Sequence, residues 1–238
     1  WSPGAGAPAS VNLAWTIVST LVVVVLTLRA LHWQVLNWQN PLRFDDAYMF
    51  YRYAMHIREG LEIAWNPDGA PTYGMTSQLW VFFVLPFTFL PLDTGDLLRL
   101  ASFSTGCAAL AVMGLTVWRF AQSSIIRVRS IALLVTGLPL LAAAKFAYQM
   151  TTGMDTMLSL LANSLLVFAL LDYVDRPRRR QAYAVGLVAF VAMLARPDNA
   201  LCALATPLLL WASREGARRW GDLFGLVVLP FALIGIDL

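Results

Sequence analysis

Two adjacent carboxylates, Asp45 and Asp46, follow the first long apolar run of the chain, in the stretch RFDDAYMFYRY. One aspartate here is typical of a helix start, because it can accept from free backbone N–H groups and favours the positive end of the helix dipole. A second carboxylate beside it costs electrostatic repulsion and tends to raise one pKa, as a general base requires. The spacing alone favours helix capping and general-base catalysis equally.

Two later turns also carry ionisable residues: MTTGMDT holds Asp155, and ARPDN holds Arg196 and Asp198. Both turns have structural interpretations. TGMD is a capping-box pattern with Thr152 as N-cap and Asp155 three residues later, and Pro197 in RPDN is typical of a first helical turn. The apolar runs beside Arg196 have only about 13 to 15 residues, or about 20 Å as helices. We therefore expect this turn below the membrane surface, where ionisable residues usually line a functional cavity.

The elements that must position these residues follow from composition. Of 238 residues, 59% are apolar and 13% are charged, whereas a soluble domain is about 45–50% apolar and about 25% charged. Such a chain has too little polar surface for water, so we predict an all-α membrane protein. The net charge of +3 comes from arginines clustered between apolar runs, which indicates membrane topology and not nucleic-acid binding.

Seven transmembrane helices are predicted, at about residues 11–31, 97–118, 131–148, 154–171, 182–194, 201–212 and 223–236. The positive-inside rule places the three arginine-rich loops between the later spans in the cytoplasm. The run at 78–92 is short and contains Pro86 and Pro91, so it is predicted as a half-buried helix that does not cross. The loop 32–96 and the turns holding Asp155 and Arg196 then share the outer side. After Asp46, apolar residues spaced by three and four predict an amphipathic surface helix: Ala47, Phe50, Ala54, Ile57 and Leu61.

Basic residues on the outer side run against the usual charge bias, so we expect some of them to meet an anion. They are Arg43, Arg52, Arg58, Arg99, Lys145 and Arg196. Among them, Arg58 fits the solvation of a surface helix. The two histidines are too few for a zinc site without carboxylates. Cys107 and Cys202 fall inside apolar runs and are expected as small buried residues, not as a disulfide.

Three blocks, in this order, resemble the membrane glycosyltransferases of the GT-C fold: FDDAYMFYRYAMHIREGLEIAWNPDGAPTYGMTSQLW, TTGMDTMLSLL and RPDNAL. The match is closest to the group that contains the terminal arabinofuranosyltransferase of mycobacterial cell walls, and it covers residues 43–201. Three positions depart from the group's pattern. Tyr73 stands where relatives tend to have Glu, Asp155 replaces a Glu, and Asn199 replaces a Gly. These changes bear on the sugar and the acceptor, not on the reaction class.

The resemblance implies an enzyme that transfers a sugar, arabinofuranose by analogy, from a polyprenyl-phosphate donor to a cell-wall or cell-surface glycan. It implies a multi-pass protein of the bacterial inner membrane with a periplasmic active site, and residues 1–238 as the N-terminal module of a longer protein. Asp45 or Asp46 would be the general base. The substrate-binding positions that it implies are Tyr48, Arg52, Asn66, Thr76, Lys145, Asp155, Arg196 and Asp198. A divalent cation, Mg²⁺ or Ca²⁺, could sit beside the donor phosphate, although no ligand spacing requires one.

Two other functions stay open. A transporter or flippase of lipid-linked sugar would also line a path with intramembrane charges, but such proteins usually show internal repeats, and this sequence shows none. A non-catalytic subunit of the same fold is consistent with the loss of the acidic residue at Tyr73, because a fold alone does not establish function. For the glycosyltransferase, the expected partners are a lipid-linked sugar donor, a glycan acceptor and the bilayer, with no nucleic acid.

Overall fold

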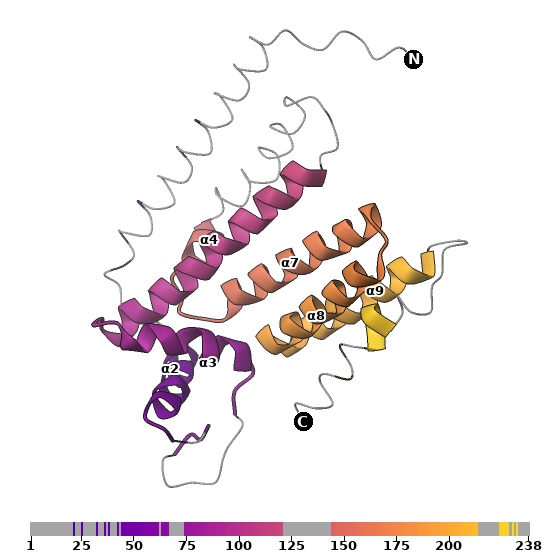
Figure 1. Cartoon of the computed structure of the whole chain (residues 1–238). Coiled ribbons are helices and arrows are strands. Elements are labelled where there is room, and N and C mark those ends of the chain that lie inside the picture. The colour runs from indigo at the N-terminus through magenta and orange to yellow at the C-terminus, as the bar shows by residue number, and fades with distance from the viewer. Residues whose placement is uncertain are drawn as a thin grey trace.

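The computed structural model (Figure 1) describes residues 44–61, 63–66, 74–120, 144–213 and 224–228, and singly residues 21, 25, 32, 36, 38, 42, 230 and 232. Every regular element in these ranges is a helix, so the all-α prediction holds for the described part of the chain. The helices are α2 (Asp45–Arg58), α3 (Gln78–Val84), η1 (Leu85–Phe89), α4 (Thr94–Phe120), α6 (Ala144–Gln149), α7 (Thr156–Asp175), α8 (Arg179–Ala195), η2 (Pro197–Asn199), α9 (Ala200–Ser213) and η3 (Phe224–Val228).

Two helices are long and apolar enough to cross a membrane: Thr94–Arg119 of α4 and Thr156–Asp175, which is α7. They coincide with the spans predicted at 97–118 and 154–171. The 20 residues of α7 cover about 30 Å, the thickness of the bilayer hydrocarbon. Most of the predicted spans 11–31 and 131–148 and half of 223–236 lie outside the described residues, so the seven-helix arrangement stays a prediction.

The helices α8 and α9 occupy the positions predicted as the spans 182–194 and 201–212. They have 17 and 14 residues, which correspond to about 25 Å and about 21 Å of helix. Both are shorter than the bilayer hydrocarbon. The expectation that the turn between them lies below the membrane surface is consistent with these lengths.

The long helices lie side by side, with α7 packed against both α4 and α8, and with α8 also in contact with α9 and η3 (Figure 1). The α8–η3 contact is made by backbone, because a Cβ at Gly186 would overlap the carbonyl oxygen of Gly225. At the far end of α4 and α7, Arg119 forms an ion pair with Asp172. The guanidinium of Arg119 also lies 5.1 Å from the centroid of the Phe168 ring.

The helix predicted after Asp46 is present as α2, and it lies with α3 at the end where α4 begins (Figure 1). Three of the residues in the predicted apolar stripe, Ala47, Phe50 and Ala54, are buried in the core. Because α2 ends at Arg58, the last residue of the stripe, Leu61, lies beyond the helix and is exposed.

The segment predicted as one half-buried helix at 78–92 consists of α3 followed by the 3₁₀ helix η1. Pro86 stands in the first turn of η1, where its missing N–H costs no hydrogen bond. Trp80, Val81 and Val84 are buried, whereas Phe82 is exposed. The segment is therefore half-buried and too short to cross a bilayer, as the sequence predicts.

Both cysteines differ from expectation. Cys107 and Cys202 are free, as predicted, but both are exposed on the protein surface and not buried in the core. The reason is that α4 and α9 are apolar around much of their circumference, so the apolar character of the run did not identify the face on which each cysteine lies.

Candidate functional site

Three segments that are far apart in the sequence meet at the end of the bundle where α4 begins. They are the start of α2, the turn 150–155 before α7, and the turn 196–199 between α8 and α9. Gly153 lies at the contact, with φ of +72°, and a Cβ there would be 3.3 Å from the Cβ of Ala47 and 3.0 Å from that of Leu98. Only glycine combines this backbone conformation with so close an approach.

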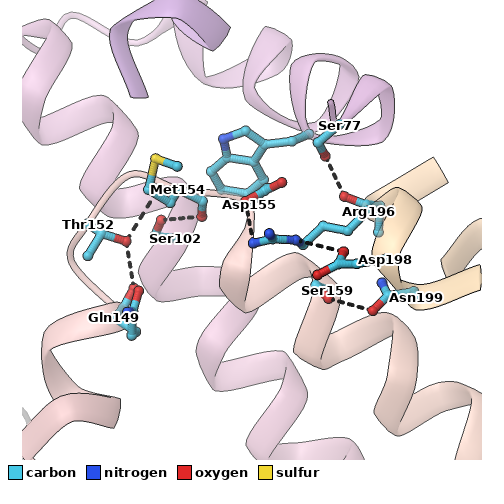
Figure 2. Close-up of polar contacts among 12 residues, drawn as sticks. Ser77, Ser102, Gln149, Thr152, Met154, Asp155, Ser159, Arg196, Asp198 and Asn199 are labelled. Carbon is cyan, nitrogen blue, oxygen red and sulfur yellow. Dashed lines mark hydrogen bonds and ion pairs between the residues drawn. The ribbon is translucent and has the colours of Figure 1, made fainter. Parts of the chain in front are cut away.

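The segment around α3 holds two of these turns in place. The indole Nε1 of Trp80 donates to the carbonyl oxygen of Gly153 at 3.2 Å, and the buried Trp80 ring stacks on Phe83. The hydroxyl of Ser77 donates to the carbonyl oxygen of Ala195 at 2.6 Å, at the end of α8 (Figure 2). The first of the three resembled blocks therefore supplies side chains that anchor the other two segments.

Arg196 lies between two carboxylates (Figure 2). Its Nη1 is 3.4 Å from Oδ1 of Asp155, and its Nε donates to Oδ1 of Asp198 at 3.0 Å. The two acids differ in environment: the side chain of Asp155 is 3% exposed, and that of Asp198 is 68% exposed. One guanidinium therefore meets one buried and one solvated carboxylate, and the cluster of the three groups carries a net negative charge when all are ionised.

Burial raises the pKa of Asp155 above its ordinary value, because removal from water disfavours the charged carboxylate. The positive charge of Arg196 opposes this shift, whereas the negative charges of Asp198 and Asp46 add to it. The start of α2, which carries Asp46, packs against the turn of Asp155, because a Cβ at Gly153 would be 3.3 Å from the Cβ of Ala47. Two of the regions predicted to cooperate thus lie within electrostatic reach.

Asp155 does not form the capping box that the local sequence suggests. It is itself the N-cap of α7, its side chain makes no capping hydrogen bond, and its carboxylate faces Arg196. The hydroxyl of Thr152 donates to the carbonyl oxygen of Gln149 at 3.0 Å and accepts from the N–H of Met154 at 3.3 Å. The capping interpretation of TGMD is therefore wrong, because a long-range ion pair takes the carboxylate.

Asn199 fixes the turn that carries Arg196, a role that the sequence did not reveal. Its Oδ1 accepts from the hydroxyl of Ser159 at 3.0 Å and from Nδ2 of Asn163 at 2.8 Å, both on α7. Its Nδ2 donates to the carbonyl oxygen of Ala192 at 2.8 Å. The one hint in the sequence was that Asn199 stands where the resembled pattern has glycine. A glycine has no side chain and could not form these three hydrogen bonds.

Asp45 and Asp46 are both exposed in the first turn of α2. The N-cap is Phe44, and no side-chain capping hydrogen bond is present. The ring of Phe44 packs against that of Tyr148 on α6, with ring centroids 6.2 Å apart. The two carboxylates are thus exposed and make no capping hydrogen bond within the described residues, which suits a reactive group as well as a dipole-stabilising one.

The other predicted binding residues make no hydrogen bond or ion pair with the Arg196 cluster in the described part of the chain. Arg52 lies with its guanidinium 4.3 Å from the Trp65 ring centroid. The side chains at the remaining four positions are exposed: Tyr48, Asn66, Thr76 and Lys145. Thr76 directly precedes the anchor Ser77.

No group of three or more His, Cys, Asp or Glu within the described residues is placed to hold a metal ion. The carboxylates of Asp155 and Asp198 share the guanidinium of Arg196. A cation at that point would have to displace the guanidinium. The expected Mg²⁺ or Ca²⁺ beside a donor phosphate stays a prediction.

The chain matches no protein-family model, no curated protein and no solved structure. The resemblance to GT-C glycosyltransferases rests on the three sequence blocks described above.

Proposed function

We propose that this chain is the catalytic membrane module of a glycosyltransferase that uses a polyprenyl-phosphate sugar as donor. Arabinofuranose is the first sugar to test, with a cell-wall or cell-surface glycan as acceptor, at the periplasmic face of a bacterial inner membrane. The observation that carries the proposal is the meeting of the three resembled blocks. The start of α2 with its two carboxylates faces the turn of Asp155, which in turn holds Arg196.

In the proposed reaction, a hydroxyl of the acceptor attacks the anomeric carbon of the donor sugar. Asp45 or Asp46 takes the hydroxyl proton as the new carbon–oxygen bond forms. The bond from the anomeric carbon to the phosphate oxygen breaks, and its electron pair leaves with the lipid phosphate. Because a phosphate is a weak base, this departure needs positive charge nearby more than it needs a proton.

The contacts of the cations favour one of them as the phosphate partner. Arg196 is engaged by two carboxylates, and Arg52 lies over Trp65. Lys145 is exposed on α6 and has no ion pair within the described part of the chain. Arg196 is then better suited to shaping the site and orienting substrate hydroxyls through Asp198 than to taking the full charge of the leaving group.

The test uses the full-length protein in detergent or proteoliposomes, with a radiolabelled polyprenyl-phosphate arabinofuranose and an oligosaccharide acceptor. Asp45→Asn and Asp46→Asn are compared with wild type and with Glu59→Gln, an exposed carboxylate at the other end of α2. Loss of a general base should lower kcat by about 10²- to 10⁴-fold in one aspartate variant. Glu59→Gln should transfer sugar at the wild-type rate.

Undiminished transfer by both aspartate variants would rule out the general-base role. Binding of the donor by wild type without any transfer would favour a transporter or a non-catalytic subunit. Transport is then measured directly, as movement of the labelled donor between the leaflets of a vesicle that contains the protein.

A further inference from the structure

The short helix α6 has one packed face and one exposed face. Ala147 and Met150 are buried, and the side chain of Met150 lies against α4, since a Cβ at Gly106 would be 2.8 Å from its Cε. Lys145 and Tyr148, three residues apart, are both exposed. Side chains at this spacing are neighbours on a helix surface. The face that α6 turns away from the bundle therefore pairs an ammonium group with an aromatic ring.

This exposed face contacts the residue that directly precedes the two aspartates of α2. The ring of Tyr148 contacts the ring of Phe44 at an interplanar angle of 54°, and Phe44 directly precedes Asp45. The side chain of Tyr148 remains 40% exposed despite this contact. The tilted contact fixes the orientation of the tyrosine ring without covering it. A ring of fixed orientation at the edge of the proposed active site is suited to receive a planar or slightly puckered group.

Lys145 is distinguished from the other cations near this end of the bundle by its contacts. Each outer-side arginine that the structure describes is engaged by a ring, a carbonyl oxygen or a carboxylate, as follows: Arg52 with Trp65, Arg58 with Phe89 and the carbonyl oxygen of Thr88, Arg99 with Asp96 and the carbonyl oxygen of Trp38, and Arg196 with Asp155 and Asp198. Lys145 has no such partner among the described residues. It is the cation best placed to take an anion from solution or lipid.

From this pairing we propose that the exposed face of α6 is the subsite for the glycosyl-phosphate headgroup of the donor, with the sugar ring on Tyr148 and the phosphate on Lys145. The proposal rests on the glycosyltransferase function. The face of an aromatic ring is electron-rich, so it attracts the polarised C–H bonds of a sugar. A lysine ammonium binds phosphate as a compact point charge. Both groups would hold the donor beside the carboxylates of α2.

The experiment measures donor KM and kcat for Tyr148→Leu, Tyr148→Phe and Lys145→Gln in the full-length protein, with polyprenyl-phosphate arabinofuranose as donor. Phe82→Leu, an exposed aromatic on α3, is the matched control. Tyr148→Leu should raise donor KM about tenfold, with kcat at saturating donor within about twofold of wild type. Lys145→Gln should raise donor KM by a similar factor and also lower kcat, because Lys145 faces the charge that develops on the departing phosphate. Tyr148→Phe keeps the ring and should keep the KM, and Phe82→Leu should not change either constant.

Inhibition by polyprenyl phosphate without a sugar separates the two halves of the subsite. Lys145→Gln should weaken this inhibition, whereas Tyr148→Leu should leave it unchanged, since the inhibitor has no ring to stack. A purely structural effect would lower kcat or the yield of folded protein in both variants and would not divide in this way. Tyr148→Trp, which restores a ring, gives a second measurement if Tyr148→Leu is poorly folded, and it should have a KM close to wild type.

The failure of this inference is distinguishable from the failure of the proposed function. If wild type transfers sugar and both Tyr148→Leu and Lys145→Gln keep the wild-type donor KM, the subsite is elsewhere and the glycosyltransferase proposal stands. If wild type neither binds nor transfers the donor, both the proposed function and the proposed donor subsite are wrong.

Discussion

Removing Arg196 tests whether the buried carboxylate of Asp155 depends on it. The variant Arg196→Gln leaves Asp155, whose side chain is 3% exposed, without its cation. An isolated buried carboxylate is unfavourable, so the variant must either lose stability or bind a proton. Asp198→Asn is the matched control, because it removes the other carboxylate that contacts the same guanidinium.

The expected magnitude follows from distance and burial. Opposite charges 3.4 Å apart attract by about 5 kcal/mol at an effective dielectric constant of about 20. Arg196 is 36% exposed, so solvent screens part of this, and we expect a net loss of about 2–3 kcal/mol. The Asp198 contact is shorter, at 3.0 Å, but that carboxylate is 68% exposed. Loss of the Asp198 contact should lower the free energy of unfolding by less than about 1 kcal/mol, because an exposed ion pair is weakened by water even when its atoms are close.

The effect should depend on pH in a defined direction. A carboxyl group whose pKa is higher in the folded than in the unfolded protein binds more protons when folded, so stability falls as pH rises through that interval. Burial places Asp155 in this class, and Arg196 limits the shift. Without Arg196 the pKa of Asp155 rises further. The loss of stability in Arg196→Gln should therefore be largest at neutral pH and should shrink as pH falls, because protonation of Asp155 removes the charge that Arg196 compensates.

The assay is thermal unfolding of purified protein, followed by tryptophan fluorescence, at about pH 7 and about pH 5. A loss of 2–3 kcal/mol corresponds to a fall in Tm of about 5–10 °C. A double-mutant cycle with Asp155→Asn should give a coupling energy of at least about 1 kcal/mol. A coupling near zero, or the same destabilisation at both pH values, would refute the reasoning.

Three further predictions concern packing, each measured by thermal unfolding against a paired variant or second substitution. Gly153→Ala should lower the free energy of unfolding by more than about 2 kcal/mol, because φ is +72° and the added methyl would lie 3.0 Å from Leu98 on α4. Gly60→Ala, with φ of +77° and nothing within 4 Å, should lower it by only about 1 kcal/mol. Equal losses would contradict the role of packing at Gly153. Gly186→Ala should greatly reduce the yield of folded protein, because its Cβ would overlap the backbone of η3. Gly114→Ala, which has nothing within 4 Å, should stabilise the folded protein by about 0.5–1 kcal/mol. Similar behaviour of the two variants would contradict the close α8–η3 contact. Asn199→Ala and Asn199→Gly should each lose about 1–3 kcal/mol through three missing hydrogen bonds, and wild-type stability in either would show that these bonds do not hold the turn.

Much of the local structure could be predicted from sequence. The apolar residues after Asp46 are spaced by three and four, and α2 buries Ala47, Phe50 and Ala54 accordingly. The position of Pro86 correctly indicated that the segment after Ser77 is not a continuous span. These features depend on helix periodicity and on backbone chemistry, both of which act within a few residues.

Side-chain partners across long sequence separations could not be predicted in the same way. The sequence offered Asp155 a local capping bond and gave no means of choosing an arginine 41 residues later. Cys107 and Cys202 show the same limit, because the apolar runs did not indicate which helix face each residue occupies.

The sequence by itself determined that this chain is apolar and helical, and where its carboxylates and arginines stand along the helices. Only the tertiary structure decided which charges meet. It set Arg196 between Asp155 and Asp198, packed the start of α2 against the turn of Asp155, and left Lys145 and Tyr148 exposed on α6. The physical reason is that helix formation is governed by neighbours within one or two turns, whereas burial of a charge depends on packing between helices that are distant in the chain.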